Sequence, residues 1–74
     1  MSVTSDYEIA EEYARASGNG IHEIVRKTTS KTLTRYYVAP AGTDPDAFRE
    51  TVLSSLGNYM RDYTLQSYRF IILT

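Results

Sequence analysis

The chain of 74 residues contains no cysteine, no tryptophan and a single histidine. Without cysteine, disulfides, thiolate zinc sites and thiol catalysis are excluded, which fits a reducing compartment. No apolar run approaches the roughly 18 residues of a membrane span, and the first six residues lack the basic and apolar regions of a signal peptide. The composition therefore predicts a cytoplasmic protein that does not enter the membrane.

The sequence also lacks a recognisable catalytic or ligand motif. His22 and Glu23 are adjacent on an expected strand, so their side chains point to opposite faces and do not form an acid-base pair. The acidic residues are scattered at helix-capping and surface positions rather than grouped as metal ligands. Residues 18–20 and 41–43 fit turns and are too short for phosphate loops. We expect no enzyme activity, no metal and no cofactor.

A first helix is predicted over residues 5–17. Ser5 to Glu8 fits a capping box, in which a serine hydroxyl and a glutamate carboxylate accept from each other's backbone amides. The glycines of residues 18–20 favour the end of the helix. Its apolar stripe consists of Ile9, Tyr13 and small alanines, which makes this the weaker of two helices.

Two strands are predicted over residues 21–27 and 32–39, because both segments are rich in β-branched and aromatic residues. The polar residues 28–31 separate them by a short connection, so they form a hairpin. Pro40 ends the second strand because it has no amide to donate. Both strands place apolar groups on both of their faces.

The principal core helix is predicted over residues 45–62. Asp44 supplies a capping carboxylate, and Pro45 suits the first helical position, where the missing amide costs nothing. The apolar stripe that follows, at spacings of three or four, consists of Phe48, Val52, Leu56, Tyr59 and Tyr63.

The final strand, over residues 67–73, is apolar on both faces, with Arg69 as its only charge. One face consists of Tyr68, Phe70 and Ile72, and the other of Ile71 and Leu73. The whole chain, residues 1–74, is thus predicted as a small single-domain α+β protein of order α-β-β-α-β with a three-stranded sheet. A right-handed crossover through the second helix places the last strand beside the first, in spatial order 2-1-3, and on an edge.

An apolar edge strand in so small a protein predicts a protein-binding function, since such an edge is an aggregation hazard unless something pairs with it. Seven tyrosines support this hypothesis, because tyrosine is enriched at interfaces. We expect a non-catalytic regulator, inhibitor or assembly factor that docks through a sheet face or the C-terminal edge to a larger protein or to itself as a homodimer. The expected partner-binding residues are Tyr36, Tyr37, Tyr68, Phe70, Ile71 and Leu73.

The distribution of charged residues along the chain suggests an alternative function. Residues 1–23 carry five acids and one arginine, whereas residues 24–43 carry four basic residues and no acid. The basic residues surround the tip of the predicted hairpin next to two tyrosines, a mixture that suits single-stranded nucleic acid. This basic patch consists of Arg26, Lys27, Lys31 and Arg35.

Two resemblances rest on architecture alone. In size and lack of motifs the chain is similar to phage-encoded inhibitors of host proteins. Its strand-strand-helix-strand order resembles the small linker domains of light-harvesting assemblies, although residues 62–66 stand where those domains have a glycine-rich turn. Such a likeness implies a fold and does not assign a function.

Overall fold

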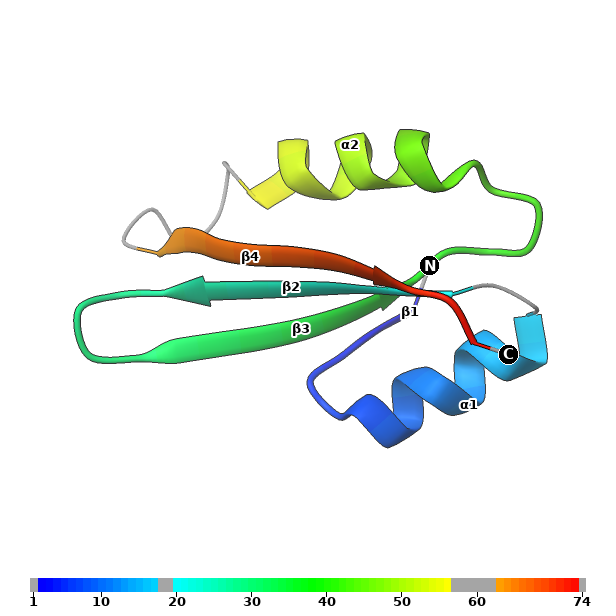
Figure 1. Ribbon diagram of the computed structural model, residues 1–74, viewed down its shortest axis with the longest axis horizontal. Helices are drawn as coiled ribbons and strands as arrows, with labels where there is room; N and C mark the ends of the chain where they lie inside the picture. Colours follow the sequence, from blue (N-terminus) through cyan, green and yellow to red (C-terminus); the bar gives the residue numbers. More distant parts are fainter. Residues whose placement is uncertain (1, 18–19, 57–62, 74) are drawn as a thin grey trace.

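The computed structural model describes residues 2–17, 20–56 and 63–73. In these residues the elements are β1 (Ser2–Thr4), α1 (Tyr7–Ser17), β2 (Ile21–Lys27), β3 (Thr32–Val38), α2 (Pro45–Leu56) and β4 (Thr64–Ile71). The strands form an antiparallel sheet in the order β1-β3-β2-β4. Helix α1 lies on one face of this sheet and α2 on the other (Figure 1). The predicted α+β class with two helices is confirmed.

The predicted three-stranded sheet is wrong, because the structure adds β1 as a fourth strand. β1 pairs with β3, with Ser2 opposite Val38 and Thr4 opposite Tyr36. Three residues are too few to show the period-two alternation by which a strand is recognised in a sequence. The short strand is stabilised by its long-range pairing with β3 rather than by a pattern of its own.

The predicted order of the other three strands is confirmed. β2 lies between β3 and β4 and is antiparallel to both. The crossover from β1 to β2 passes over β3, and the crossover from β3 to β4 passes over β2. Both crossovers move in the same direction across the sheet but start from antiparallel strands. A common right-handed sense therefore requires the two helices to lie on opposite faces, as Figure 1 shows.

Helix α1 packs on the sheet through small residues, which corrects the predicted stripe. Ala10 and Ala14 are buried, whereas Ile9 and Tyr13 are 40% and 47% exposed. Small side chains allow the helix backbone to approach the strands closely, so they supply the contact in place of bulky residues. The cap also differs from the expected capping box, because Asp6 Oδ1 accepts from the Glu8 amide at 2.9 Å. Helix α1 accordingly begins at residue 7 instead of 5.

Helix α2 begins as predicted. Asp44 Oδ2 accepts from the Ala47 amide at 3.1 Å, and the helix buries Phe48 and Val52 against the sheet. The described part of the helix ends at Leu56. The remainder of the predicted range, residues 57–62, lies outside the described residues.

Two apolar clusters result, one on each face of the sheet. Beneath α1 the buried residues are Ala10, Ala14, Ile21 and Val38, with Tyr7, Tyr36, Ile71 and Leu73 packed against them. Beneath α2 they are Ile24, Ala39, Phe48 and Val52, with Tyr37, Leu53, Leu56 and Tyr68 packed against them. Neighbouring positions of β2 and β3 alternate between the clusters, which explains why both strands are apolar on both faces.

Candidate protein-binding site

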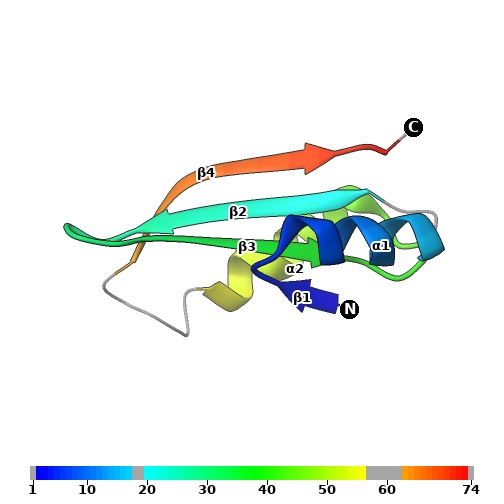
Figure 2. The same ribbon diagram turned by 90° about the horizontal axis from the view of Figure 1, so that it is seen from below.

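Strand β4 is the long edge of the sheet. It spans eight residues, Thr64–Ile71, and so begins three residues earlier than predicted. On one side β4 pairs with β2, and on the other side no strand of the described residues pairs with it. Figure 2 shows β4 along one side of the sheet and the three-residue β1 at the other. The predicted edge position of the last strand is confirmed.

Two large apolar side chains of this edge strand are exposed. Leu65 is 48% exposed and Phe70 is 38% exposed. Leu65 lies opposite Arg26, and Phe70 lies opposite His22. Because directly opposed residues of a pair share a face, both belong to the α2 face of the sheet. Ile72, just beyond the strand, is 70% exposed. The edge therefore offers apolar side chains at both ends of an unpaired backbone.

The one charge of β4 does not protect this edge. Natural edge strands often carry a charged side chain that discourages pairing with another chain. Arg69 instead donates to both carboxylate oxygens of Glu23 on β2, at 2.9 and 3.0 Å. This pairing raises the pKa of Arg69 and holds its guanidinium over the sheet. A bidentate pair across two strands stabilises their register and leaves the outer edge open.

The buried side chain of His22 on β2 contacts β4 on the α2 face of the sheet. His22 on β2 is 2% exposed. The centroid of its ring lies 4.7 Å from the ring centroid of Phe48 and 4.6 Å from that of Phe70, on which it stacks. Its Nδ1 atom is hydrogen-bonded to the Tyr68 hydroxyl. Burial lowers the pKa of His22 and raises the pKa of Tyr68, because it penalises the charged form of each. The neutral pair thus joins β2 and β4 to α2.

Gly20 fixes the end of β4 against the start of β2. A Cβ atom at this position would lie 2.5 Å from the carbonyl oxygen of Ile71 and 2.7 Å from a ring carbon of Phe70. Only a residue without a side chain permits so close an approach. The exposed end of β4 is consequently held in one place.

The expected partner-binding residues do not form one surface. Tyr36, Ile71 and Leu73 pack against the buried cluster beneath α1. Tyr37 and Tyr68 pack against the cluster beneath α2, and Phe70 stacks on His22. Five of the six therefore help to form the cores, and Phe70 is the one that is exposed at the edge. Residues of one apolar run alternate between faces, so the run alone does not define a surface.

The basic patch is also divided. Arg26 and Arg35 lie on the α2 face, Lys27 lies on the α1 face, and Lys31 is at the hairpin tip. Arg26 is largely buried and donates to the backbone oxygen of Tyr63 at 3.1 Å. Four charges spread in this way give weaker support to single-stranded nucleic acid as the ligand than the sequence suggested.

Sequence reasoning missed two apolar residues at the β4 edge, Leu65 and Ile72, and one residue of β2 that contacts β4, His22. Leu65 preceded the predicted start of the strand, and Ile72 was placed on the strand but not among the binding residues. His22 was not predicted as a functional residue, because the side chain of its neighbour Glu23 points to the other face of the strand. Its partner, Tyr68, is 46 positions distant. The register of β2 against β4, with His22 opposite Phe70 and Ile24 opposite Tyr68, brings the two side chains together.

No protein-family model, no curated protein and no solved structure matches the chain. Within residues 2–17, 20–56 and 63–73, no helix is long and apolar enough to cross a membrane. The same described residues contain no group of three or more His, Asp or Glu side chains placed to hold a metal ion.

Proposed function

We propose that this chain is a non-catalytic protein-binding module that receives an extended strand at the outer edge of β4, from a larger protein or from a second copy. The observation that carries the proposal is an eight-residue edge strand whose exposed side chains include Leu65 and Phe70 and whose one charge is engaged by Glu23. In strand addition the backbone groups of the edge provide affinity, and alternate side chains provide specificity.

The two edges of the sheet differ in a way that favours β4. β1 has three residues, which offers few backbone groups to an added strand. β4 has eight residues. His22 contacts it on the α2 face through Tyr68, and the close approach of Gly20 fixes its C-terminal end. A preorganised edge loses little conformational entropy when a strand is added to it. If the added strand is β4 of a second copy, a two-fold axis would join two sheets into one continuous sheet.

The test is site-specific photocrosslinking with a photoreactive phenylalanine analogue at Leu65 or, as a control, at Val3. The two positions are matched, since Leu65 is 48% and Val3 46% exposed, but they lie on opposite edge strands. We expect adducts from position 65 and none from position 3, in the purified chain if the added strand comes from a second copy and only in lysate if it comes from a larger protein. The mass of each adduct distinguishes a second copy from a larger protein.

Association would then be weakened by a charge at the same edge. Leu65→Lys and Ile72→Lys should reduce complex formation in sedimentation velocity, while Val3→Lys and Ile9→Lys should not, because those two residues are exposed elsewhere. Ile71→Lys and Leu73→Lys are unsuitable variants, since both side chains pack against the core beneath α1. Equal crosslinking from both edges, or none from either, would overturn the proposal.

A further inference from the structure

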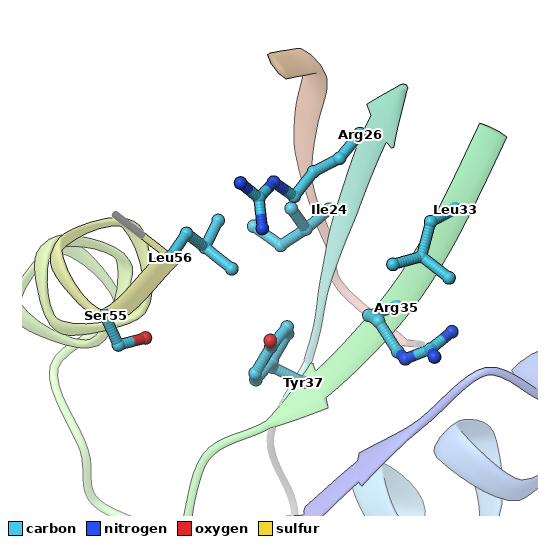
Figure 3. Close-up of a pocket in the computed structure, with 7 residues that line it drawn as sticks. All are labelled: Ile24, Arg26, Leu33, Arg35, Tyr37, Ser55 and Leu56. Carbon is cyan, nitrogen blue, oxygen red and sulfur yellow. The ribbon is translucent and has the colours of Figure 1, made fainter. Parts of the chain in front are cut away.

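A second surface lies on the α2 face of the sheet, over β3 and apart from the β4 edge. It is a pocket of about 230 Å³ between the C-terminal end of α2 and strands β2 and β3. Its lining residues are Ile24, Arg26, Leu33, Arg35, Tyr37, Ser55 and Leu56. Figure 3 shows Leu56 and Ser55 of α2 on one side and Leu33, Arg35 and Tyr37 of β3 on the other.

The chemistry of this lining is apolar and cationic. Ile24, Leu33 and Leu56 provide apolar walls, and among the described residues no carboxylate lines the pocket. Arg35 donates to the neighbouring backbone oxygen of Thr34, and the ion pairs among the described residues do not include it. A guanidinium beside an apolar wall suits a ligand that joins an apolar group to a carboxylate, because arginine binds carboxylates through parallel hydrogen bonds.

The size of the pocket restricts the occupant further. Small-molecule sites in proteins usually enclose about 300 to 1,000 Å³, and a cavity of about 150 Å³ holds a benzene ring. At about 230 Å³ this pocket accommodates one large side chain and leaves the rest of a ligand outside. An apolar side chain of a longer chain fits these limits better than a complete small molecule does.

The arrangement of β3 suggests how such a chain would lie. Leu33, Arg35 and Tyr37 are alternate residues of one strand, so they form a row on one face with a spacing of about 6.6 to 6.8 Å. An extended peptide repeats its side chains on one face at the same spacing. A peptide with an apolar residue in the pocket would therefore place a carboxylate over Arg35 when the acidic residue is two positions away.

We propose that this pocket binds an extended acidic peptide segment of a partner protein, with an apolar side chain seated between Leu33 and Leu56 and a carboxylate two residues away on Arg35. The site shares no lining residue with the exposed β4 edge, and it does not depend on strand addition there. The same chain would then have two separable contact surfaces.

The probe is the pentapeptide acetyl-Glu-Ser-Leu-Ser-Glu-amide, titrated into the isotope-labelled full chain and followed by amide chemical shifts. We expect the shifts to map to Leu33, Arg35, Tyr37 and Leu56. Exchanging both glutamates of the peptide for glutamine, or its leucine for serine, should each weaken binding about tenfold, since each removes one of the two contacts. A peptide with glutamates directly next to the leucine should bind as weakly as these controls.

Protein variants separate the pocket from general charge attraction. Arg35→Gln should weaken binding of the pentapeptide about tenfold, whereas Lys31→Gln removes the same charge at the hairpin tip and should leave it unchanged. Leu65→Lys, at the β4 edge, should also leave it unchanged, so this proposal and the proposed strand addition fail independently.

Three results would overturn the inference. The first is an equal loss of binding in Lys31→Gln, which would mean unspecific attraction. The second is binding that does not distinguish glutamate from glutamine in the peptide. The third is phenylacetate binding as tightly as the pentapeptide, which would assign the pocket to small carboxylates instead of a peptide segment.

Discussion

Acid should destabilise this protein at a mildly acidic pH because of His22. The side chain is 2% exposed and lies among Phe48, Phe70 and Tyr68. Burial lowers the pKa of His22 below its ordinary value of about 6.5. In the unfolded chain the histidine is solvated and titrates near that ordinary value. Below it the unfolded state binds more protons than the folded state, so the free energy of unfolding falls as the pH falls.

The magnitude follows from linkage. One proton of difference between the two states changes the free energy of unfolding by up to about 1.4 kcal/mol per pH unit. A domain of this size has only about 3 to 5 kcal/mol of net stability, so a single pH unit removes a sizeable part of it. The loss begins near pH 6.5 and continues down to the lowered pKa of the folded state.

The surroundings make this window easy to interpret. His22 is the only histidine of the chain, and carboxylates titrate mainly near pH 4. Two charged groups act on its hydrogen-bond partner Tyr68: Arg49, whose Cζ lies 5.0 Å from the centroid of the Tyr68 ring, and Asp46. Both belong to α2.

The assay is urea unfolding, followed by circular dichroism, at several pH values between about 5 and 7.5. The wild type should lose stability below pH 6.5, and His22→Gln, although less stable overall, should show a flat profile between pH 5 and 6.5. A wild type that gains stability on acidification would mean that the folded state favours the imidazolium, which contradicts a lowered pKa of His22. Parallel profiles for the two proteins would refute it equally.

Three other perturbations test the packing and the alternative ligand. Phe48→Ala should lower the free energy of unfolding by about 3 to 5 kcal/mol, because it empties a buried site. Ile9→Ala should lower it by less than about 1 kcal/mol, because Ile9 is exposed. Thermal melts compare the two variants, and equal losses of stability would contradict the exposed position of Ile9. Gly20→Ala should destabilise by about 1 to 3 kcal/mol, because the Ile71 carbonyl must move, and hydrogen exchange at the Ile71 amide should rise. A labelled single-stranded oligonucleotide should show no micromolar binding at about 0.15 M salt; salt-sensitive binding that Lys27→Gln and Lys31→Gln abolish would favour the nucleic-acid alternative.

Local signals in the sequence were sufficient for several elements. The hairpin strands coincide closely with their predicted ranges, because the Thr28 hydroxyl accepts from the amides of Ser30 and Lys31 and closes a short polar turn. The Asp44 cap was predictable for a similar reason, since it acts within three residues. The sheet order of β3, β2 and β4 followed from the crossover rule, which does not depend on particular side chains.

Features that depend on long-range geometry were not predictable in this way. For helix α1 the sequence predicted a single stripe of Ile9, Tyr13 and small alanines, whereas the structure buries the alanines and exposes the two bulky side chains. The difference in its cap is local: the structure uses Asp6 instead of the predicted Ser5, because the Thr4 hydroxyl accepts from the Asp6 amide and orients that residue. The candidate site required the register of β2 against β4, which includes an irregularity after Val25 that no local pattern indicates.

The two helices leave parts of both sheet faces open. Beneath α1 the buried strand residues are Ile21 and Val38, and beneath α2 Tyr37 and Tyr68 pack beside the buried Ile24. Ser67 and Arg69 of β4 remain exposed on the α1 face, and Leu33 and Arg35 of β3 are only partly buried on the α2 face.

These two open faces differ in composition. The α1 face of β4 carries Ser67 and Arg69, which suits contact with water. The α2 face of β3 carries Leu33 and Tyr37 around Arg35, an apolar and cationic row that solvation alone does not require. The same contrast holds along β4 itself, where the polar side chains face α1 and Leu65 and Phe70 face α2. The proposed partner on the α2 side of the sheet would account for both exceptions, and exchanging Leu33 for threonine should reduce peptide binding without reducing association through β4.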